Sequence, residues 1–180
     1  MAGALRDVAV CVDSSSLSEH AWRWTVALLE SAAAAPDSPA PAVRVISVAV
    51  AAPLDLWTPD EEPPWLVGTA SSEEDRTRKA EEARAVAAAQ ARVADLLHRI
   101  PPPQHVTVTT LTPLVHGTIG ETIIASLKDN PPGLCVCGAR GMGGLHRLVV
   151  GLADTLLRGL GSVSDHVVHN AAFPCVVVKR

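Results

Sequence analysis

Apolar residues in this chain gather in two kinds of segment: short valine-rich runs, and longer stretches in which they recur every three or four positions. The short runs are predicted strands, and they cover residues 8–12, 43–50, 106–111, 134–137 and 175–178. The first, fourth and fifth runs are apolar without interruption, which is typical of parallel strands covered on both faces. The pattern therefore favours a parallel sheet between two layers of helices.

The longer stretches are predicted helices, and their starts carry serine or threonine three residues ahead of glutamate, as in a capping box. These pairs are Ser16 with Glu19, Ser71 with Glu74, and Thr118 with Glu121. Helices are expected from Ser16, over residues 72–99, from Thr118 and over residues 164–170, and the apolar stripe of the first is Leu17, Ala21, Trp24 and Leu28. The alternation predicts an α/β fold with an open, Rossmann-like sheet of five parallel strands, ordered 3-2-1-4-5, and helices on both faces.

The composition is that of one domain with an aliphatic core. Hydrophobic residues make up 48% of the 180 positions and aromatic ones only 3%, so alanine, valine, leucine and isoleucine must fill the interior. A chain of this length is expected to form a single domain over residues 1–180. Within it we expect a proline-rich loop at residues 53–70 and interpret residues 152–161 as an insertion.

Charge and hydropathy argue against two classes of partner. The net charge of −4 offers no overall basic surface for nucleic acid. The longest apolar run, residues 45–54, is far shorter than the ~20 residues of a membrane-spanning helix. Arg6 and Asp7 stand where a signal peptide would be apolar. We therefore expect no nucleic-acid or membrane partner, and a location in the cytoplasm, with the nucleus as the alternative.

The four cysteines, Cys11, Cys135, Cys137 and Cys175, all fall in predicted strands. The Cys-x-Cys spacing of Cys135 and Cys137 matches neither a zinc knuckle nor a thioredoxin-like pair. We interpret the four as buried free thiols that act as small apolar side chains, and we expect no structural metal.

The most suggestive chemistry follows the first and fourth strands. In an open parallel sheet, ligands bind beyond the carboxyl ends of the strands where the strand order reverses, here between these two strands. Asp13 and Ser14 end the first strand, and the spacing Gly138-x2-Gly141-x9-Gly151 follows the fourth. Glycines let backbone N–H groups wrap a phosphate, because no side chain blocks the approach. Taken alone this spacing is weak evidence, and Asp13 suits an ordinary turn or helix cap as well.

In combination, these segments resemble the universal stress protein family, and in particular its plant-type single-domain members. The matching segments run from Val8 to Ser15, over His116-Gly117, from Gly138 to Leu145, from Ser162 to His169 and from Pro174 to Lys179. The resemblance spans nearly the whole chain. It implies a homodimer formed through the last strand, from Cys175 to Lys179, and a role in the stress response.

The resemblance also implies a site for an adenine nucleotide, ATP or AMP, with or without Mg²⁺. Asp13, with Ser14, would lie near the adenine or its ribose, and Val48 would line the adenine pocket. The other residues that it assigns to the nucleotide are His116, Gly117, Gly138, Arg140, Gly141, Gly143, Gly144, Gly151, Ser162, Val163 and Ser164. His116 suits an ordinary loop position better than that of a catalytic base.

The chain departs from the family pattern directly after Gly151. Removing residues 152–161 would join Gly151 to Ser162 and restore the expected glycine–hydroxyl pair. Doubling a loop costs only about 0.6 kcal/mol, whereas losing a hydroxyl bond to a charged phosphate costs roughly 1.5–3 kcal/mol. Binding is therefore at more risk than folding.

Two functions stay open at this point: an adenine-nucleotide-binding stress protein, and a dimeric interaction protein of the same fold with impaired or lost nucleotide binding. Enzymatic activity is expected to be at most slow ATP hydrolysis. The sequence has neither a Gly-x4-Gly-Lys-Ser/Thr loop nor a Gly-x-Ser-x-Gly nucleophile elbow.

Overall fold

The computed structural model of the chain describes residues 7–32, 41–51, 72–139 and 161–179. The proline-rich loop at residues 53–70 and residues 152–160 of the predicted insertion lie outside this part of the chain. None of the described helices is both long and apolar enough to cross a membrane.

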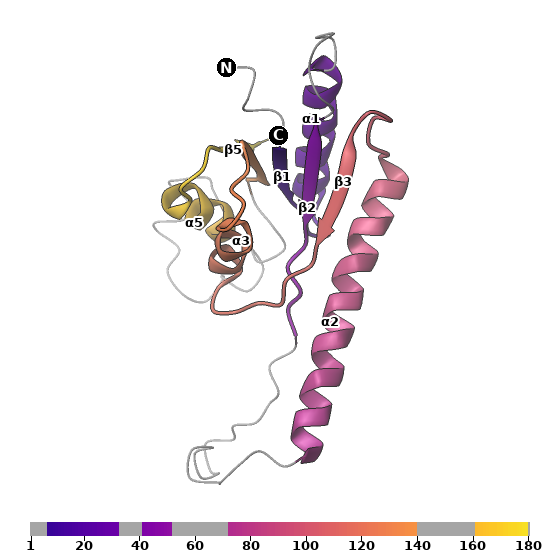
Figure 1. Ribbon diagram of the computed structural model, residues 1–180, viewed down its shortest axis with the longest axis vertical. Helices are drawn as coiled ribbons and strands as arrows, with labels where there is room; N and C mark the ends of the chain where they lie inside the picture. Colours follow the sequence, from indigo (N-terminus) through magenta and orange to yellow (C-terminus); the bar gives the residue numbers. More distant parts are fainter. Residues whose placement is uncertain (1–6, 33–40, 52–71, 140–160, 180) are drawn as a thin grey trace.

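The described strands form one parallel sheet in the predicted order (Figure 1). They are β1 (Asp7–Cys11), β2 (Ala42–Ile46), β3 (Thr107–Leu111), β4 (Leu134–Gly138) and β5 (Cys175–Val178). Neighbouring strands follow the order β3-β2-β1-β4-β5, and each neighbouring pair is parallel. β1 is thus the central strand, because it pairs with β2 on one side and with β4 on the other.

Helices cover both faces of the sheet, as predicted. They are α1 (Ser16–Ala32), α2 (Ser72–Arg99), α3 (Ile119–Leu127) and α5 (Ser162–Asn170). The strand valines on one face pack with α1 and α2 around the buried Trp22. The other face packs with α3 and α5 around Ile123, Leu127 and Val167. Figure 1 shows α2 extending well past the end of the sheet.

The buried face of α1 matches the predicted stripe only in part: Ala21 is fully buried, and Leu17 and Leu28 are half-buried. Trp22, Thr25 and Leu29 are fully buried, whereas Trp24, which we expected in the core, is 36% exposed. Two polar residues lie on the buried face, and their hydroxyls bond within the helix or its cap: Thr25 donates to Ala21 O at 2.9 Å, and Ser18 to Asp13 O at 2.7 Å. The indole N–H of Trp22 donates to the carbonyl oxygen of Ile100 at 2.8 Å, which ties α1 to the end of α2.

β2 ends at Ile46, four residues earlier than predicted. The residues that follow it pair with the segment after β3. Ser47 N–H donates to Leu111 O at 3.0 Å, and Ala49 N–H donates to Pro113 O at 2.8 Å. Ala49 and Leu114 form an isolated parallel bridge. The segments after β2 and β3 therefore continue together, past the end of β1.

The amino ends of β1 and β2 are joined by a paired ionic contact. Arg44 donates to both carboxylate oxygens of Asp7, at 3.0 Å from Nε and 2.6 Å from Nη2, and its Nη1 donates to Asn130 O at 2.6 Å. The Arg44 side chain is only 11% exposed. This contact lies at the amino ends of the strands, whereas ligands are expected at their carboxyl ends.

Replacing Trp22 by phenylalanine is expected to destabilise the protein. The change leaves the buried carbonyl of Ile100 without its indole donor, which costs about 1–3 kcal/mol. Trp24→Phe on the exposed face of the same helix is the matched control and is expected to change stability by no more than about 0.5 kcal/mol. Urea unfolding followed by far-UV circular dichroism measures both. Equal losses in the two variants would contradict the assignment of Trp22 as the buried anchor.

Candidate functional site

The carboxyl ends of β1 and β4 lie side by side at the centre of the sheet, and the strand order reverses between them. We call these two strand ends, with the described residues that follow them, the switch point. The connection after β1 leads to β2 on one side, whereas β5 lies on the other side of β4. In open parallel sheets, ligands bind at such a reversal.

The turn after β1 is built around Asp13. Its Oδ1 accepts a hydrogen bond from the backbone N–H of Ser15 at 2.8 Å. The Ser15 hydroxyl oxygen then accepts from Ser18 N–H at 3.1 Å. Ser15 is therefore the N-cap of α1, one residue before the Ser16 that we predicted. Asp13 is half-buried and Ser14 is exposed. The structure gives Asp13 its turn role, and its role towards a ligand stays a prediction.

Gly138 lies where β4 meets the first turn of α1. A Cβ on Gly138 would stand 2.9 Å from both the carbonyl carbon and the carbonyl oxygen of Leu17, and 3.1 Å from the nitrogen of Ser18. These are backbone atoms, so they cannot move aside as the end of a long side chain can. Glycine is needed here because helix and strand approach so closely.

The start of α5 is fastened to the end of β4. Gly161 N–H donates to the carbonyl oxygen of Ala139 at 2.5 Å, and the Ser164 hydroxyl donates to the same oxygen at 3.2 Å. Ala139 N–H donates to Val178 O at 3.0 Å. α5 begins at Ser162 with Gly161 as its N-cap, two residues earlier than predicted. Ala139 and Gly161, the described residues on either side of residues 140–160, therefore meet at the switch point.

The three predicted site residues in the first turn of α5 differ in how far their side chains are buried. Ser162 is exposed, Val163 packs against the core on the α3 side, and Ser164 is buried and holds the helix to β4. The backbone N–H groups of a first helical turn have no partners within the helix, and the helix dipole favours anions there. Asp165 lies in the same turn, and its charge opposes an anion.

His116 and Gly117 lead into α3, on the same face of the sheet as α5. Gly117 has a φ of +72°, in the left-handed region that favours glycine. The capping box that follows is the predicted one: Glu121 N–H donates to the Thr118 hydroxyl at 3.2 Å, and Thr118 N–H donates to Glu121 Oε2 at 2.8 Å. His116 is exposed, and its backbone N–H donates to Thr122 Oγ1 at 2.9 Å.

Arg92 is a residue that the sequence pattern missed. It projects from α2, donates from Nη2 to the carbonyl oxygen of Val48 at 3.3 Å, and approaches the Ser47 hydroxyl at 3.4 Å. Val48 itself is half-buried beyond the end of β2, not within the strand as predicted. The sequence shows only that a charged residue lies next to the buried Val93 of α2, and it gives no indication of the partner.

The predicted site residues thus divide into three groups. Asp13, Ser14, Gly138, Ser162, Val163 and Ser164 all lie at the ends of β1 and β4 or in the turns directly attached to them. Val48 lies in the segment after β2, and His116 and Gly117 lead into α3. Arg140, Gly141, Gly143, Gly144 and Gly151 lie outside the described residues.

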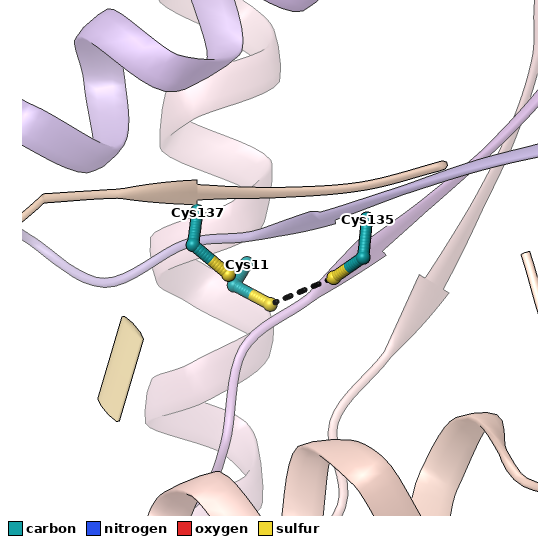
Figure 2. Close-up of side chains that lie close together, drawn as sticks. All are labelled: Cys11, Cys135 and Cys137. Atoms are coloured by element: carbon teal, nitrogen blue, oxygen red, sulfur yellow. Dashed lines mark hydrogen bonds between the residues drawn. The ribbon is translucent and has the colours of Figure 1, made fainter. Parts of the chain in front are cut away.

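A cluster of thiols lies directly beneath the switch point (Figure 2). The sulfurs of Cys11, Cys135 and Cys137 are within 4.8 Å of one another, and Cys11 Sγ and Cys135 Sγ are 4.0 Å apart. The hydrogen bond with Cys11, the neighbouring thiols and burial raise the pKa of the Cys135 thiol above its usual range. The four cysteines were expected as separate buried thiols, whereas alternation along β4 and the register of β1 bring three of them together.

Comparison with known proteins identifies the family. The sequence profile of the universal stress protein family matches residues 4–179. Because this match covers nearly the whole chain, the protein belongs to that family, as the sequence motifs indicated. No curated protein matches the sequence.

Solved structures resemble this chain over almost their full length. MJ0577, a protein whose biochemical function was assigned from its structure, is 16% identical with a TM-score of 0.60, over 98% of this chain and 96% of its own. UspA from Lactobacillus plantarum is 20% identical with a TM-score of 0.57, over 97% of each chain. A universal stress protein in complex with cAMP is 13% identical with a TM-score of 0.50, again over 97% of each. At these identities the likeness concerns the fold.

The capping box of α3 is expected to make stability depend on pH. The bond from Thr118 N–H, then the Thr118 hydroxyl and the charge of His166, hold the pKa of Glu121 below its usual range. The folded state therefore favours the carboxylate. The stabilisation is fully present above the unfolded-state pKa of about 4.3 and is lost as the pH falls through the lower folded-state value.

The measurement is the difference in unfolding free energy between the wild type and Glu121→Gln, from pH 7 down to pH 3. We expect a difference that is constant near neutrality and shrinks in the acid range. Glu30→Gln, at an exposed position of α1, is the control. A difference that grows as the pH falls would contradict the sign.

Proposed function

We propose that this universal stress protein binds an adenine nucleotide, ATP or AMP, at the switch point and acts through it in stress response or signalling. The observation that carries the proposal is the convergence of three elements on adjacent strand ends. They are the Asp13 turn, the glycine that ends β4 and the N-terminus of α5. The complex of a structural neighbour with cAMP supports an adenine-containing ligand.

In this proposal, each element meets a different part of the nucleotide. The carboxylate of Asp13, with Ser14 beside it, accepts hydrogen bonds from the ribose or the adenine amino group. Val48 lines the adenine, and the Arg92 contact to its carbonyl fixes that segment. Gly138 lets the end of β4 pack directly against the first turn of α1, which holds the Asp13 turn beside the strand end that the ribose would meet.

The phosphates extend towards the first turn of α5 in the same proposal. The dipole and unpaired N–H groups at a helix start stabilise an anion by about 0.3–1 kcal/mol. Ser162, exposed at that start, supplies a hydroxyl, with Val163 and Ser164 fixing the turn. His116 and Gly117 border this side of the site. Arg140, Gly141, Gly143, Gly144 and Gly151 complete the phosphate loop, and Mg²⁺ accompanies ATP.

Isothermal titration with ATP and AMP, and with GTP for comparison, tests the proposal. We expect saturable binding of the adenine nucleotides. Asp13→Ala and Asp13→Asn are both expected to weaken it about tenfold to a hundredfold, the equivalent of one hydrogen bond to a charged group. The asparagine variant keeps an oxygen for the Ser15 N–H and so separates the carboxylate's role towards ligand from its role in the turn.

Asp129→Asn is the matched control for this titration. Asp129 is exposed after α3 and precedes Asn130. The carbonyl oxygen of Asn130 accepts a hydrogen bond from Arg44 at the amino ends of the strands, away from the switch point. The control is expected to bind like the wild type. No heat with ATP or AMP up to millimolar concentration would overturn the proposal. Loss in Asp13→Ala but not in Asp13→Asn would leave Asp13 only its turn role.

The second candidate is a dimeric interaction protein in which residues 152–161 weaken the phosphate site. β5 is an edge strand and three of its four residues are half-buried, which favours a homodimer formed from Cys175 to Lys179. Such a dimer leaves the opposite edge of the sheet, at β3, free for other contacts.

Deleting residues 152–161 separates the two candidates. The deletion places Gly151 before Ser162, in the N-cap position that Gly161 holds in the full chain. If the insertion holds the hydroxyl away from the phosphates, ATP affinity is expected to rise about tenfold to a hundredfold, with a smaller change for AMP. Sedimentation equilibrium should give the same dimer for both chains. Unchanged ATP affinity would show that the insertion does not impair binding.

A further inference from the structure

All four cysteines face the layer formed by α3 and α5, and three of them converge. Cys135 and Cys137 alternate onto one face of β4, and Cys175 pairs with Cys135 across to β5. Ala9 pairs with Cys135, which places Cys11, two residues further along β1, beside the pair on β4. Figure 2 shows the side chains of Cys135 and Cys137 leaning towards each other, with the Cys11 sulfur between theirs in this view.

The spacing of the three sulfurs matches the needs of one metal ion. An ion bound to three sulfurs at bond lengths of about 2.3 Å holds them about 4 Å apart. Cys11 Sγ and Cys135 Sγ are 4.0 Å apart, and all three pairs are within 4.8 Å. A disulfide would need a sulfur–sulfur distance of about 2.0 Å, and the four cysteines are free thiols in the structure.

We propose that Cys11, Cys135 and Cys137 form a binding site for a soft metal ion, Cu(I) or Zn²⁺, directly beneath the switch point. Thiolates are the ligands that select these ions over Mg²⁺ or Ca²⁺. Each thiol that becomes a ligand releases its proton to solvent. The proposal reverses our expectation of no structural metal, which considered the spacing of the cysteines in sequence and not their placement by the sheet.

Whether Cys175 supplies a fourth sulfur ligand distinguishes the two ions. Cys175 pairs with Cys135 across β4 and β5, and its sulfur donates to the carbonyl oxygen of Phe173 at 3.4 Å. Three sulfurs alone suit Cu(I), whereas Zn²⁺ in a structural site takes four ligands in a tetrahedron. A rotation of the Cys175 side chain away from Phe173 would supply the fourth.

Among the described residues, the surroundings of the three thiols are largely apolar and buried. Cys135 is fully buried and Cys137 is 3% exposed, among apolar side chains that include Ile123, Val167 and Phe173. Cys11 is only partly buried and lies at the carboxyl end of β1. Cys11 is therefore the most exposed of the three thiols.

The test titrates the reduced full-length protein with Cu(I) and with Zn²⁺, each against a competing chelator, and records X-ray absorption of the loaded protein. We expect one ion per chain with sulfur neighbours at about 2.3 Å: three for Cu(I), or four for Zn²⁺. Cys137→Ser and Cys135→Ser are expected to weaken binding by more than the roughly 100-fold that loss of an outer-shell partner costs.

Cys175→Ser distinguishes the two ions, because it should leave the affinity for Cu(I) unchanged and weaken the affinity for Zn²⁺. Near-UV circular dichroism shows whether each variant is folded. The proposal is overturned if neither ion binds stoichiometrically, or if binding survives in both folded Cys135→Ser and Cys137→Ser. If these variants do not fold, nitrogen or oxygen ligation in the wild-type absorption spectrum overturns it instead.

Discussion

The close approach of β4 to the start of α1 is the constraint on which the rest of the structure depends. Backbone meets backbone at Gly138 and Leu17, with room for no side chain between them. This contact fixes the Asp13 turn relative to the end of β4. The carbonyl oxygen of Ala139, the next residue, then accepts hydrogen bonds from Gly161 and Ser164 at the start of α5. One packing requirement thus sets the geometry of three elements at the switch point.

Much of the fold was predictable because its signals are local. Uninterrupted valine runs mark buried parallel strands, and the Thr118–Glu121 pair marks a helix start that the structure reproduces bond for bond. The buried face of α1 was predicted only in part, because apolar residues alone defined the stripe. Ser18 and Thr25 are buried there, since the helix and its cap satisfy their hydroxyls, and the buried tryptophan is Trp22 rather than Trp24.

The site was only partly predictable, because it combines local and distant signals. The turn residue Asp13 and the strand-ending Gly138 stand out in the sequence, since each directly follows or ends a recognisable strand. Arg92 does not, because its contact with Val48 depends on where a long helix crosses the segment after β2. The convergence of Cys11 with Cys135 likewise depends on the register of two strands whose cysteines are 124 residues apart.

The central position of β1 has a consequence for how the chain is assembled. β2 follows β1 in sequence and can pair with it, and β3 with β2, while the rest of the chain is still being synthesised, but the other neighbour of β1, β4, arrives later. Until then, one side of the innermost strand is an open edge, a template for pairing with another chain. That open side is closed only by β4 and β5, the last two of the described strands in the sequence.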